Sequence, residues 1–522
     1  MINFKNNPKM TEAIISPNTY IANNSLSGAF SDMPNLKSVS LPNNKIVNVA
    51  NMCFNCPSLT NAPMNYVNSV TNMSYVYANC YNLPGSAVCG ANVTDMSYAY
   101  SRCHNLTGNP VCGVNVTNMF ATYQFCYNIT GNPVCSNNVT NFYATYQLCY
   151  NITGSPVCGP NVTNMGYVYN DCSNIKGSPV CGNNLTDMTA AYQHCRNLTG
   201  SAVCGNKVTS VSYTYFNCHN ITGAPVCGPN VIDMSRAYYN CYNITGTPVC
   251  GNNVTTMAYT YYGCNKLAGP PVCGNNVTNM HCTYYCCGDL TGSPVCGNNV
   301  TTIAYAYRNC FNITGNPVCG PNVTSMYATY YICNKLTGNP VCGDKVTTMY
   351  AAYYSCTNLT GHAICGPNVT NMSWTYAACY NIHKNAYLYS DNISDVTYCF
   401  YGKDTSRRLN IYVNNGTTSL NTCLRNDATS MVGGNITWTF SGDYYYNTAQ
   451  NIYIYPVANV HEAYDKNENG NGYAKGFLED FVYTYSNNTY TITDWKGTYN
   501  GVASTELIVP YITNANIVIN LD

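Results

Sequence analysis

The chain has 522 residues and a formal net charge of zero, with 21 basic and 21 acidic residues, and only 8% of its residues are charged. Soluble domains usually carry roughly 25% charged residues. Because attraction to polyphosphates needs a surplus of Lys and Arg, this composition argues against nucleic acid and anionic membranes as partners. No stretch approaches the about 18 unbroken apolar residues of a transmembrane helix, so membrane insertion is not expected.

The first residues are polar and irregular, and we expect residues 1–24 to form an N-terminal arm or cap. They lack the basic stretch followed by an apolar core that marks a secretory signal. The sequence therefore predicts a protein that is made and assembled in a cytoplasm.

From residue 25 to residue 402 one unit of 23 residues recurs, N-V-T-N-M-x-x-x-Y-x-x-C-x-N-(L/I)-T-G-x-P-V-C-G-x. One tyrosine and two cysteines hold this frame from copy to copy. The first regular members of these three rows are Tyr77, Tyr100 and Tyr123; Cys80, Cys103 and Cys126; and Cys89, Cys112 and Cys135. After Cys379 the frame slips, because Cys399 follows after 20 residues.

A unit of this length cannot bury its own apolar side chains, so it must bury them against the units before and after it. The period therefore predicts a solenoid of about 15 turns. The recurring Val, Met, Tyr, Cys, Leu/Ile, Val and Cys should stack into internal ladders along its axis. The Gly-x-Pro step interrupts helices, which favours a short strand with an irregular return in each coil.

The segment Val93 to Thr107, V-T-D-M-S-Y-A-Y-S-R-C-H-N-L-T, resembles the BspA-type leucine-rich repeat, V-T-x-(I/M)-x-x-x-F-x-x-C-x-x-L-T. The resemblance covers about residues 25–400 and implies a β-rich solenoid of short parallel strands and irregular returns. The chain departs from the motif in two places. Tyr replaces Phe in every regular coil, and Gly-x-Pro-Val-Cys replaces a more β-branched strand. Since proline cannot donate to a ladder, we expect strands of two or three residues.

The 33 cysteines do not read as a disulfide framework. In a ladder each Cys has two equivalent neighbours, so the spacing specifies no unique pairing, and the total is odd. The pattern favours buried free thiols that fill a narrow core, with isolated cross-links between coils as the alternative. Reduced thiols would again indicate a reducing cytoplasm.

No motif in the repeats assembles a catalytic or metal site, and no cofactor is predicted. The segment His281 to Cys287, H-C-T-Y-Y-C-C, contains the residue types of a zinc site, but their spacing favours a degenerate coil with extra cysteines. Cys103–His104 and Cys218–His219 have the residue types of a nucleophile and its base. We do not expect either pair to act so, because the thiol should point into the core and the neighbouring His outward. The frequent Asn-x-Thr, as at Asn92 and Asn105, is interpreted as turn capping rather than glycosylation.

Residues 403–522 leave the repeat and are rich in β-formers, so we expect a β-rich C-terminal domain with one helix near Val457–Tyr464. A hairpin turn is expected at Ser486–Thr489. Asp465–Gly470, D-K-N-E-N-G, resembles the first half of a calcium loop, but position twelve is Gly476. A solvated turn is the favoured interpretation of that segment.

These features favour a non-enzymatic structural and adhesive protein, a bacteriophage virion fibre or tail appendage that contacts the host surface. Repeats of the resembled family occur on microbial surfaces and in phage tail genes, so a cell-surface adhesin of a bacterium or protist is the alternative. Expected partners are other virion proteins at the termini and a host-surface glycan or protein, in a homo-oligomer or a larger assembly. An enzyme confined to the C-terminal region would have to use its sparse carboxylates, Glu462, Glu468, Asp480 and Asp494.

Overall fold

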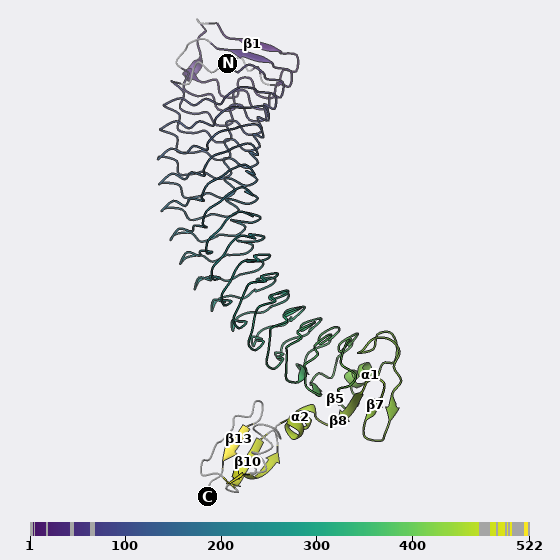
Figure 1. Cartoon of the computed structure of the whole chain (residues 1–522). Helices are drawn as coiled ribbons and strands as arrows, with labels where there is room; N and C mark the ends of the chain where they lie inside the picture. The colour runs from purple at the N-terminus through teal and green to yellow at the C-terminus, as the bar shows by residue number, and fades with distance from the viewer. Residues whose placement is uncertain are drawn as a thin grey trace. The chain divides into compact units, whose positions relative to one another are not determined.

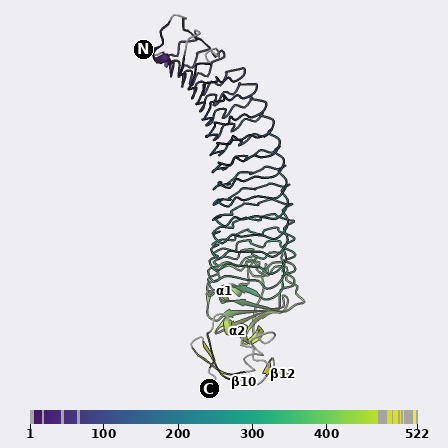
Figure 2. The same cartoon turned by 90° about the vertical axis from the view of Figure 1, so that its left-hand side faces the viewer.

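The computed structural model describes residues 4, 6–16, 19–41, 46–62, 68–468, 481–486, 489–495, 498–499, 502–503 and 516–519, and the burial of side chains as far as Tyr464. The chain divides into two compact units, residues 1–337 and residues 338–522. We describe each unit by itself. Most of unit 1 is a stack of coils that follow one another in register (Figures 1 and 2).

Each regular coil of unit 1 is built from consecutive turns. The N–H groups of Tyr98 and Tyr100 donate to carbonyls of the next coil, at 2.8 and 2.9 Å. The N–H of Ala99, between them, donates back to the carbonyl of Met96 at 3.0 Å. Alternate amides thus bond along the axis and within the coil, which satisfies the backbone without a helix or a long strand.

The alternation needs unusual backbone angles. Tyr98 and Arg102 have φ of 55° and 62°, in the left-handed region, and the equivalent positions of the other coils repeat this pattern. A residue other than glycine rarely adopts such φ angles, since its Cβ crowds the backbone. The repeated hydrogen bonds between coils hold these residues there.

Parallel pairing in the regular coils of unit 1 is shorter than the strands of two or three residues that the sequence predicts. Among the described regular coils it consists of single-residue bridges. Most lie just before the recurring Met, such as Asp95 to Asn118 and Asn118 to Asn141, and two others join Ser201 to Thr222 and Gly269 to Leu290. The Pro-Val-Cys segments of these coils form no strand. A three-residue strand does form in unit 2 at Ala363–Cys365 (β3). The replacement of proline by Ala363 does not by itself explain this strand, since Ala202 stands at the same repeat position and its segment forms none.

The core of unit 1 is a set of columns along the axis. In one coil the side chains of Val93, Met96, Tyr100, Cys103 and Leu106 are each 0% exposed. The second Val and second Cys of these coils are half-buried, so their two columns lie nearer the surface than the other five. The predicted fold class, a β-rich solenoid of leucine-rich-repeat-like coils, is confirmed.

Outer Asn and Thr side chains also bond along the axis. The Nδ2 of Asn92 donates to the carbonyl of Asn68 at 2.9 Å. The Oγ1 of Thr117 donates to the carbonyl of Thr94 at 3.2 Å. The amide of Asn105 makes a longer contact, 3.4 Å, with the side chain of Asn82. These bonds support the structural interpretation of the Asn-x-Thr motifs.

The stack begins earlier than residue 25. The strand β1 (Glu12–Ile14) pairs in parallel with β2 (Ser38–Ser40), and a short 3₁₀ turn, η1 (Ala22–Asn24), lies between them. Part of the segment expected to be an N-terminal arm therefore already pairs as a coil would.

Unit 2 contains a six-stranded sheet in the order β3-β4-β5-β8-β7-β6. The strands β3, β4 (Asn385–Leu388), β5 (Leu409–Asn414) and β8 (Ile452–Val457) are parallel to one another. The strands β7 (Tyr445–Asn447) and β6 (Thr439–Phe440) add an antiparallel edge.

Two helices accompany this sheet, whereas the sequence predicts one. The helix α2 (Val460–Glu468) lies slightly later than predicted. The helix α1 (Thr418–Cys423) was not predicted, because six residues are too few to show a helical period. Its start is marked by Thr417, whose side chain accepts a hydrogen bond from the N–H of Leu420.

The last strands of unit 2 form a small sheet in the order β13-β10-β9 and a separate hairpin, β11-β12. Their bounds are β9 (Phe481–Ser486), β10 (Thr489–Trp495), β11 (Thr498–Tyr499), β12 (Val502–Ala503) and β13 (Asn516–Ile519). The strands β9 and β10 are antiparallel neighbours on either side of the predicted hairpin turn.

Candidate functional site

The buried tyrosines form one column of rings. Tyr77 and Tyr100 have ring centroids 5.7 Å apart, and Tyr100 and Tyr123 stack at 5.7 Å with an interplanar angle of 5°. The hydroxyl of Tyr100 accepts from the N–H of Val88 at 3.0 Å and donates to its carbonyl at 2.8 Å. The column is therefore a structural element. Its hydroxyls hydrogen-bond to the backbone N–H and carbonyl of the Val in Val-Cys segments that form no strand.

The inner cysteines lie beside the tyrosines in a second buried column. The thiols of Cys80, Cys103 and Cys126 each donate to a backbone carbonyl of the preceding coil, at 3.0 to 3.1 Å. Burial raises the pKa of all three well above that of a free thiol. A neutral, hydrogen-bonded, buried thiol is a poor nucleophile.

The outer cysteines are half-buried and form a third column. The sulfur of Cys89 accepts from the N–H of Gly113, one coil on, at 3.2 Å. Burial raises the pKa of Cys89 to about 11 and that of Cys135 to about 12, and it raises the pKa of Cys112 as well. None of the 33 cysteines, all of which lie in the described part of the chain, is joined to another by a disulfide.

The two Cys-His neighbours do not form nucleophile pairs. The ring of His104 stacks between Tyr81 and Tyr127, with centroids at 4.9 and 4.6 Å, while the Cys103 thiol bonds inward. Burial, and to a smaller extent Arg102, lowers the pKa of His104. His219 likewise lies against Tyr242 at 4.9 Å.

The residues of the zinc candidate point to different partners. The Nε2 of His281 lies 3.1 Å from the hydroxyl of Tyr259, and the Cys287 thiol donates to the carbonyl of Tyr261 at 3.0 Å. Within the described part of the chain, no three His, Cys, Asp or Glu side chains are grouped so that they could hold a metal ion.

The calcium candidate Asp465–Gly470 lies outside the described residues, apart from the backbone of Asp465–Glu468 in α2. The side chains of Glu468, Asp480 and Asp494 are also outside them, so the carboxylates suggested for a C-terminal enzyme stay a prediction. Glu462, in the first turn of α2, is exposed. The described helices include none that is both apolar enough and long enough to cross a membrane.

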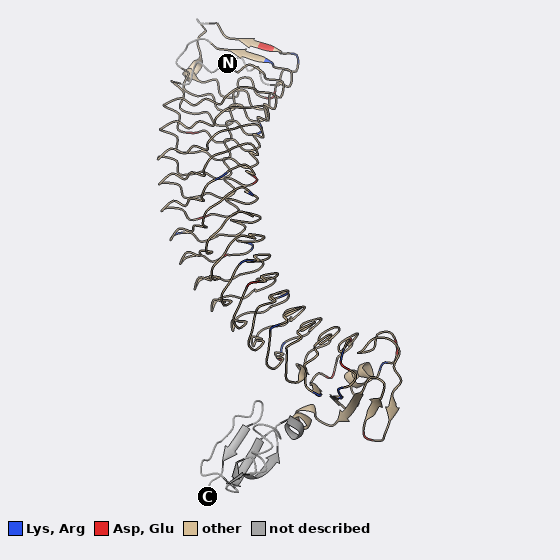
Figure 3. Cartoon of the chain, viewed as in Figure 1, with Lys and Arg blue, Asp and Glu red and all other residues tan. Residues whose placement is uncertain are grey.

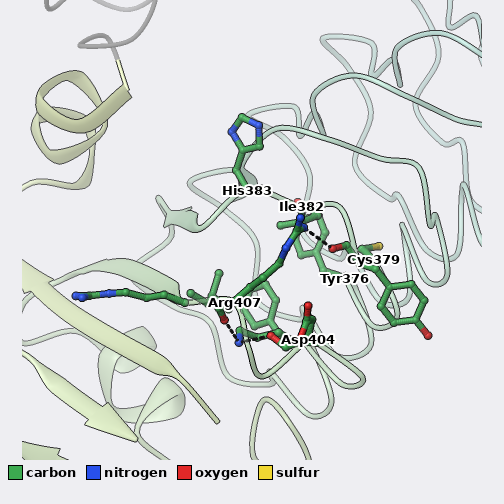
Figure 4. Close-up of a pocket in the computed structure, with 11 residues that line it drawn as sticks. Tyr376, Cys379, Ile382, His383, Asp404 and Arg407 are labelled. Atoms are coloured by element: carbon green, nitrogen blue, oxygen red, sulfur yellow. Dashed lines mark hydrogen bonds between the residues drawn. The ribbon is translucent and has the colours of Figure 1, made fainter. Parts of the chain in front are cut away.

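A small cavity in unit 2 has a volume of about 30 Å³ (Figure 4). Its lining includes Tyr376, Cys379, His383, Asp404 and Arg407. The Nη1 of Arg407 donates to the carbonyl of Tyr380 at 3.1 Å, and the Nζ of Lys403 donates to the carbonyl of Asp404 at 3.0 Å. Such a volume suits ordered water rather than an organic ligand.

A larger feature lies on the surface of unit 1, and the sequence analysis missed it. We call it the aromatic strip: two adjacent columns of half-buried side chains on six consecutive coils. Column A is Tyr213, Arg236, Tyr259, His281, Tyr305 and Tyr327, and column B is Phe216, Tyr239, Tyr262, Tyr285, Arg308 and Tyr331. Figure 3 shows how thinly charged residues are spread over the coils around it.

The rings of column B stack almost face to face. Phe216 and Tyr239 have centroids 4.5 Å apart, and the Tyr239–Tyr262 and Tyr262–Tyr285 pairs are at 4.4 Å, with interplanar angles of 12°, 6° and 11°. The two columns also touch, since Tyr259 of column A lies 6.1 Å from Tyr262. The strip is therefore one continuous surface.

Part of this surface could have been found in the sequence. The members of column B recur every 23 residues from Phe216 to Tyr331. Column A breaks the frame, because its ring comes from one repeat position at His281 and Tyr327 and from the following position at Tyr259 and Tyr305. Only the structure shows that the two positions fill one column.

No protein-family model matches the chain, and no curated protein matches it. Among solved structures, a leucine-rich repeat protein from Bacteroides ovatus is similar, with 13% identity, a TM-score of 0.30 and coverage of 77% of this chain and 80% of that one. A leucine-rich cell surface protein from Faecalibacterium prausnitzii has 14% identity, a TM-score of 0.28 and coverage of 73% and 89%.

Proposed function

We propose that the chain is a non-enzymatic adhesive protein exposed at a microbial surface, where its coils form a scaffold and its aromatic strip makes contact. The strip is the observation that carries this proposal. Twelve large side chains, ten of them aromatic, stay half-buried in two adjacent columns on one face of the stack. Contiguous exposed surface of this kind is typical of interaction sites.

The buried chemistry of the chain supports a scaffold role. The inner thiols and the phenols of the buried column are satisfied by backbone groups of neighbouring coils. Their hydrogen bonds and raised pKa values fit a task of holding coils together. The partners we expect are a host-surface glycan or protein at the strip and neighbouring proteins of an assembly at the termini.

A virus particle is the second candidate for the surface that carries the protein. The observation that favours it is that the inner cysteines, such as Cys103 and Cys126, are buried thiols hydrogen-bonded to backbone carbonyls and not joined in disulfides. Chains that fold in oxidising compartments usually pair their cysteines, so free thiols favour assembly in a reducing cytoplasm and release by lysis. Mass spectrometry of purified particles and of surface-shaved cells would distinguish a fibre or tail appendage from a cell-surface adhesin.

Adhesion of the full chain tests the proposal directly. Beads coated with the folded protein should adhere to a panel of bacterial and animal cells, and excess soluble protein should release them. Beads coated with the urea-unfolded chain are the control for unspecific sticking. Equal adhesion by both kinds of bead, or adhesion by neither, would refute the adhesive function.

A further inference from the structure

We propose that the aromatic strip binds an acidic polysaccharide, whose carboxylate or sulfate groups meet Arg236 and Arg308. This inference rests on the proposed adhesive function and names the ligand class of its contact surface. It depends on three observations: how the two guanidinium groups are held, which parts of the rings are open, and where acidic side chains lie.

Both arginines of the strip are sandwiched by aromatic rings. Arg236 lies over Tyr213 at 5.1 Å and over Tyr259 at 4.6 Å. Arg308 lies over Tyr331 at 4.1 Å and against Tyr285 at 5.6 Å. A guanidinium held by its faces keeps its N–H edge in a fixed plane, which matches a carboxylate or sulfate.

These two cations have no acidic partner. Neither guanidinium makes an ion pair or a hydrogen bond within the described residues, and the Nε of Arg308 is buried without a hydrogen-bond partner. The strip contains no Asp or Glu. The acid nearest to Arg236 in the sequence, Asp233, accepts a hydrogen bond from the N–H of Ser235 at 2.7 Å. Because no acidic side chain neutralises them, the guanidinium groups of both arginines are available to an oxyanion of a ligand.

The stacking in column B decides which part of each ring a ligand can meet. Because Tyr239, Tyr262 and Tyr285 stack at 4.4 Å, each ring covers the faces of its neighbours, and outward contact is left to ring edges and hydroxyls. Ring edges carry partial positive charge, and phenol hydroxyls donate hydrogen bonds. A nucleobase or a neutral sugar would need an open ring face to stack on, and few ring faces in column B are open. A ligand rich in hydrogen-bond acceptors instead meets ring edges and phenol hydroxyls.

The length of the strip favours a polymer. At the ~4.8 Å spacing of paired strands, six coils extend over about 24 Å. The two arginines lie three coils apart, on different columns, so one extended chain that carries acidic groups at intervals can meet both. His281 adds no charge at neutral pH, since burial and Arg236 lower its pKa.

Polygalacturonate and its fully methyl-esterified form are matched probes, because they share a backbone and differ in charge. We expect the full chain to bind the acid polymer at least about tenfold more tightly than the ester in a calorimetric titration, with binding that weakens as salt rises. The double variant R236Q/R308Q should lose at least about tenfold in affinity for the acid polymer, the scale of one charged hydrogen bond.

The control is R102Q/R196Q, which removes the same charge from two exposed arginines outside the strip, with thermal unfolding measured for both doubles. Should R236Q/R308Q unfold, R236K/R308K keeps the charge and removes the planar edge, and we expect it to bind several-fold more weakly than the wild type. Equal losses in the two glutamine doubles, tight binding of the ester, or tighter binding of a single-stranded oligonucleotide would each overturn the ligand class. Bead adhesion separates the two proposals: adhesion without polygalacturonate binding refutes only this inference.

Discussion

The buried tyrosine of each coil links the two departures from the motif that the sequence resembles. The family's usual Phe has no hydroxyl, and its more β-branched strand can bond to neighbouring strands. Here Pro-Val-Cys does not form a ladder, and the Tyr hydroxyl bonds to both the N–H and the carbonyl of its Val, as Tyr123 does with Val111 at 3.0 and 2.8 Å. The same two bonds form where alanine stands in place of the proline, as between Tyr215 and Val203 and between Tyr376 and Ile364, so the hydroxyl serves this segment whether or not proline is present.

Replacing one buried hydroxyl tests this role. In Y192F the ring still stacks on both neighbours, but the N–H and carbonyl of Val180 lose the partner that lies at 3.0 and 2.8 Å. We expect a loss of about 1–3 kcal/mol in the free energy of unfolding, measured by urea denaturation. Y127F is the control, because Tyr127 is half-buried and stacks on His104 and Tyr150. Equal stability of the two variants would contradict the role of the hydroxyl.

The residue scale also shows where sequence reasoning stops. The 23-residue frame placed Tyr77, Cys80 and their equivalents in ladders, because a fixed period leaves few other places for them. It could not show that the Tyr hydroxyl reaches a Val twelve residues before it, since that contact depends on the path of the turns. The frame also treated both cysteine rows alike, although only the inner row is fully buried.

At the scale of the element, the coil is a chain of turns in which glycine provides close approach. Gly200 has φ of +82°, and a Cβ there would lie 2.2 Å from the Oγ of Ser178 in the preceding coil. The equivalent Gly85 has φ of +85°, but a Cβ there would meet nothing within 4 Å. A Cβ at this repeat position would therefore be strained by the backbone angle in both coils, but only at Gly200 would it also clash with a neighbouring side chain.

This pair gives a matched prediction. G85A should cost about 1 kcal/mol, the price of a left-handed angle for a residue with a Cβ. G200A should cost a further 1–3 kcal/mol, roughly the cost of overpacking, because Ser178 must move. Urea midpoints of the full-length variants measure the difference. If the two variants are equally stable, coils approach each other less closely than the structure shows.

At the scale of the whole molecule, neutral thiols and phenols fill the core where other proteins place aliphatic side chains. Their low polarity depends on their staying protonated. Burial raises the pKa of Cys89, Cys158 and Cys227 from 9.0 to about 11, and that of Cys135 to about 12. The buried tyrosines, such as Tyr146, have their pKa raised for the same reason.

The stability of the chain should therefore fall at alkaline pH. Between pH 9 and pH 11 the unfolded thiols lose protons that the folded thiols still hold, so the free energy of unfolding decreases as pH rises. We expect the unfolding temperature to be level up to pH 8 and to drop steadily above pH 9. The phenolate absorbance of the buried tyrosines should appear as a step that coincides with the loss of circular dichroism, because these rings ionise only when the coils open, whereas exposed tyrosines such as Tyr380 and Tyr401 can ionise in the folded chain. Ionisation of all 52 tyrosines with the dichroism intact would show that these columns are open to solvent.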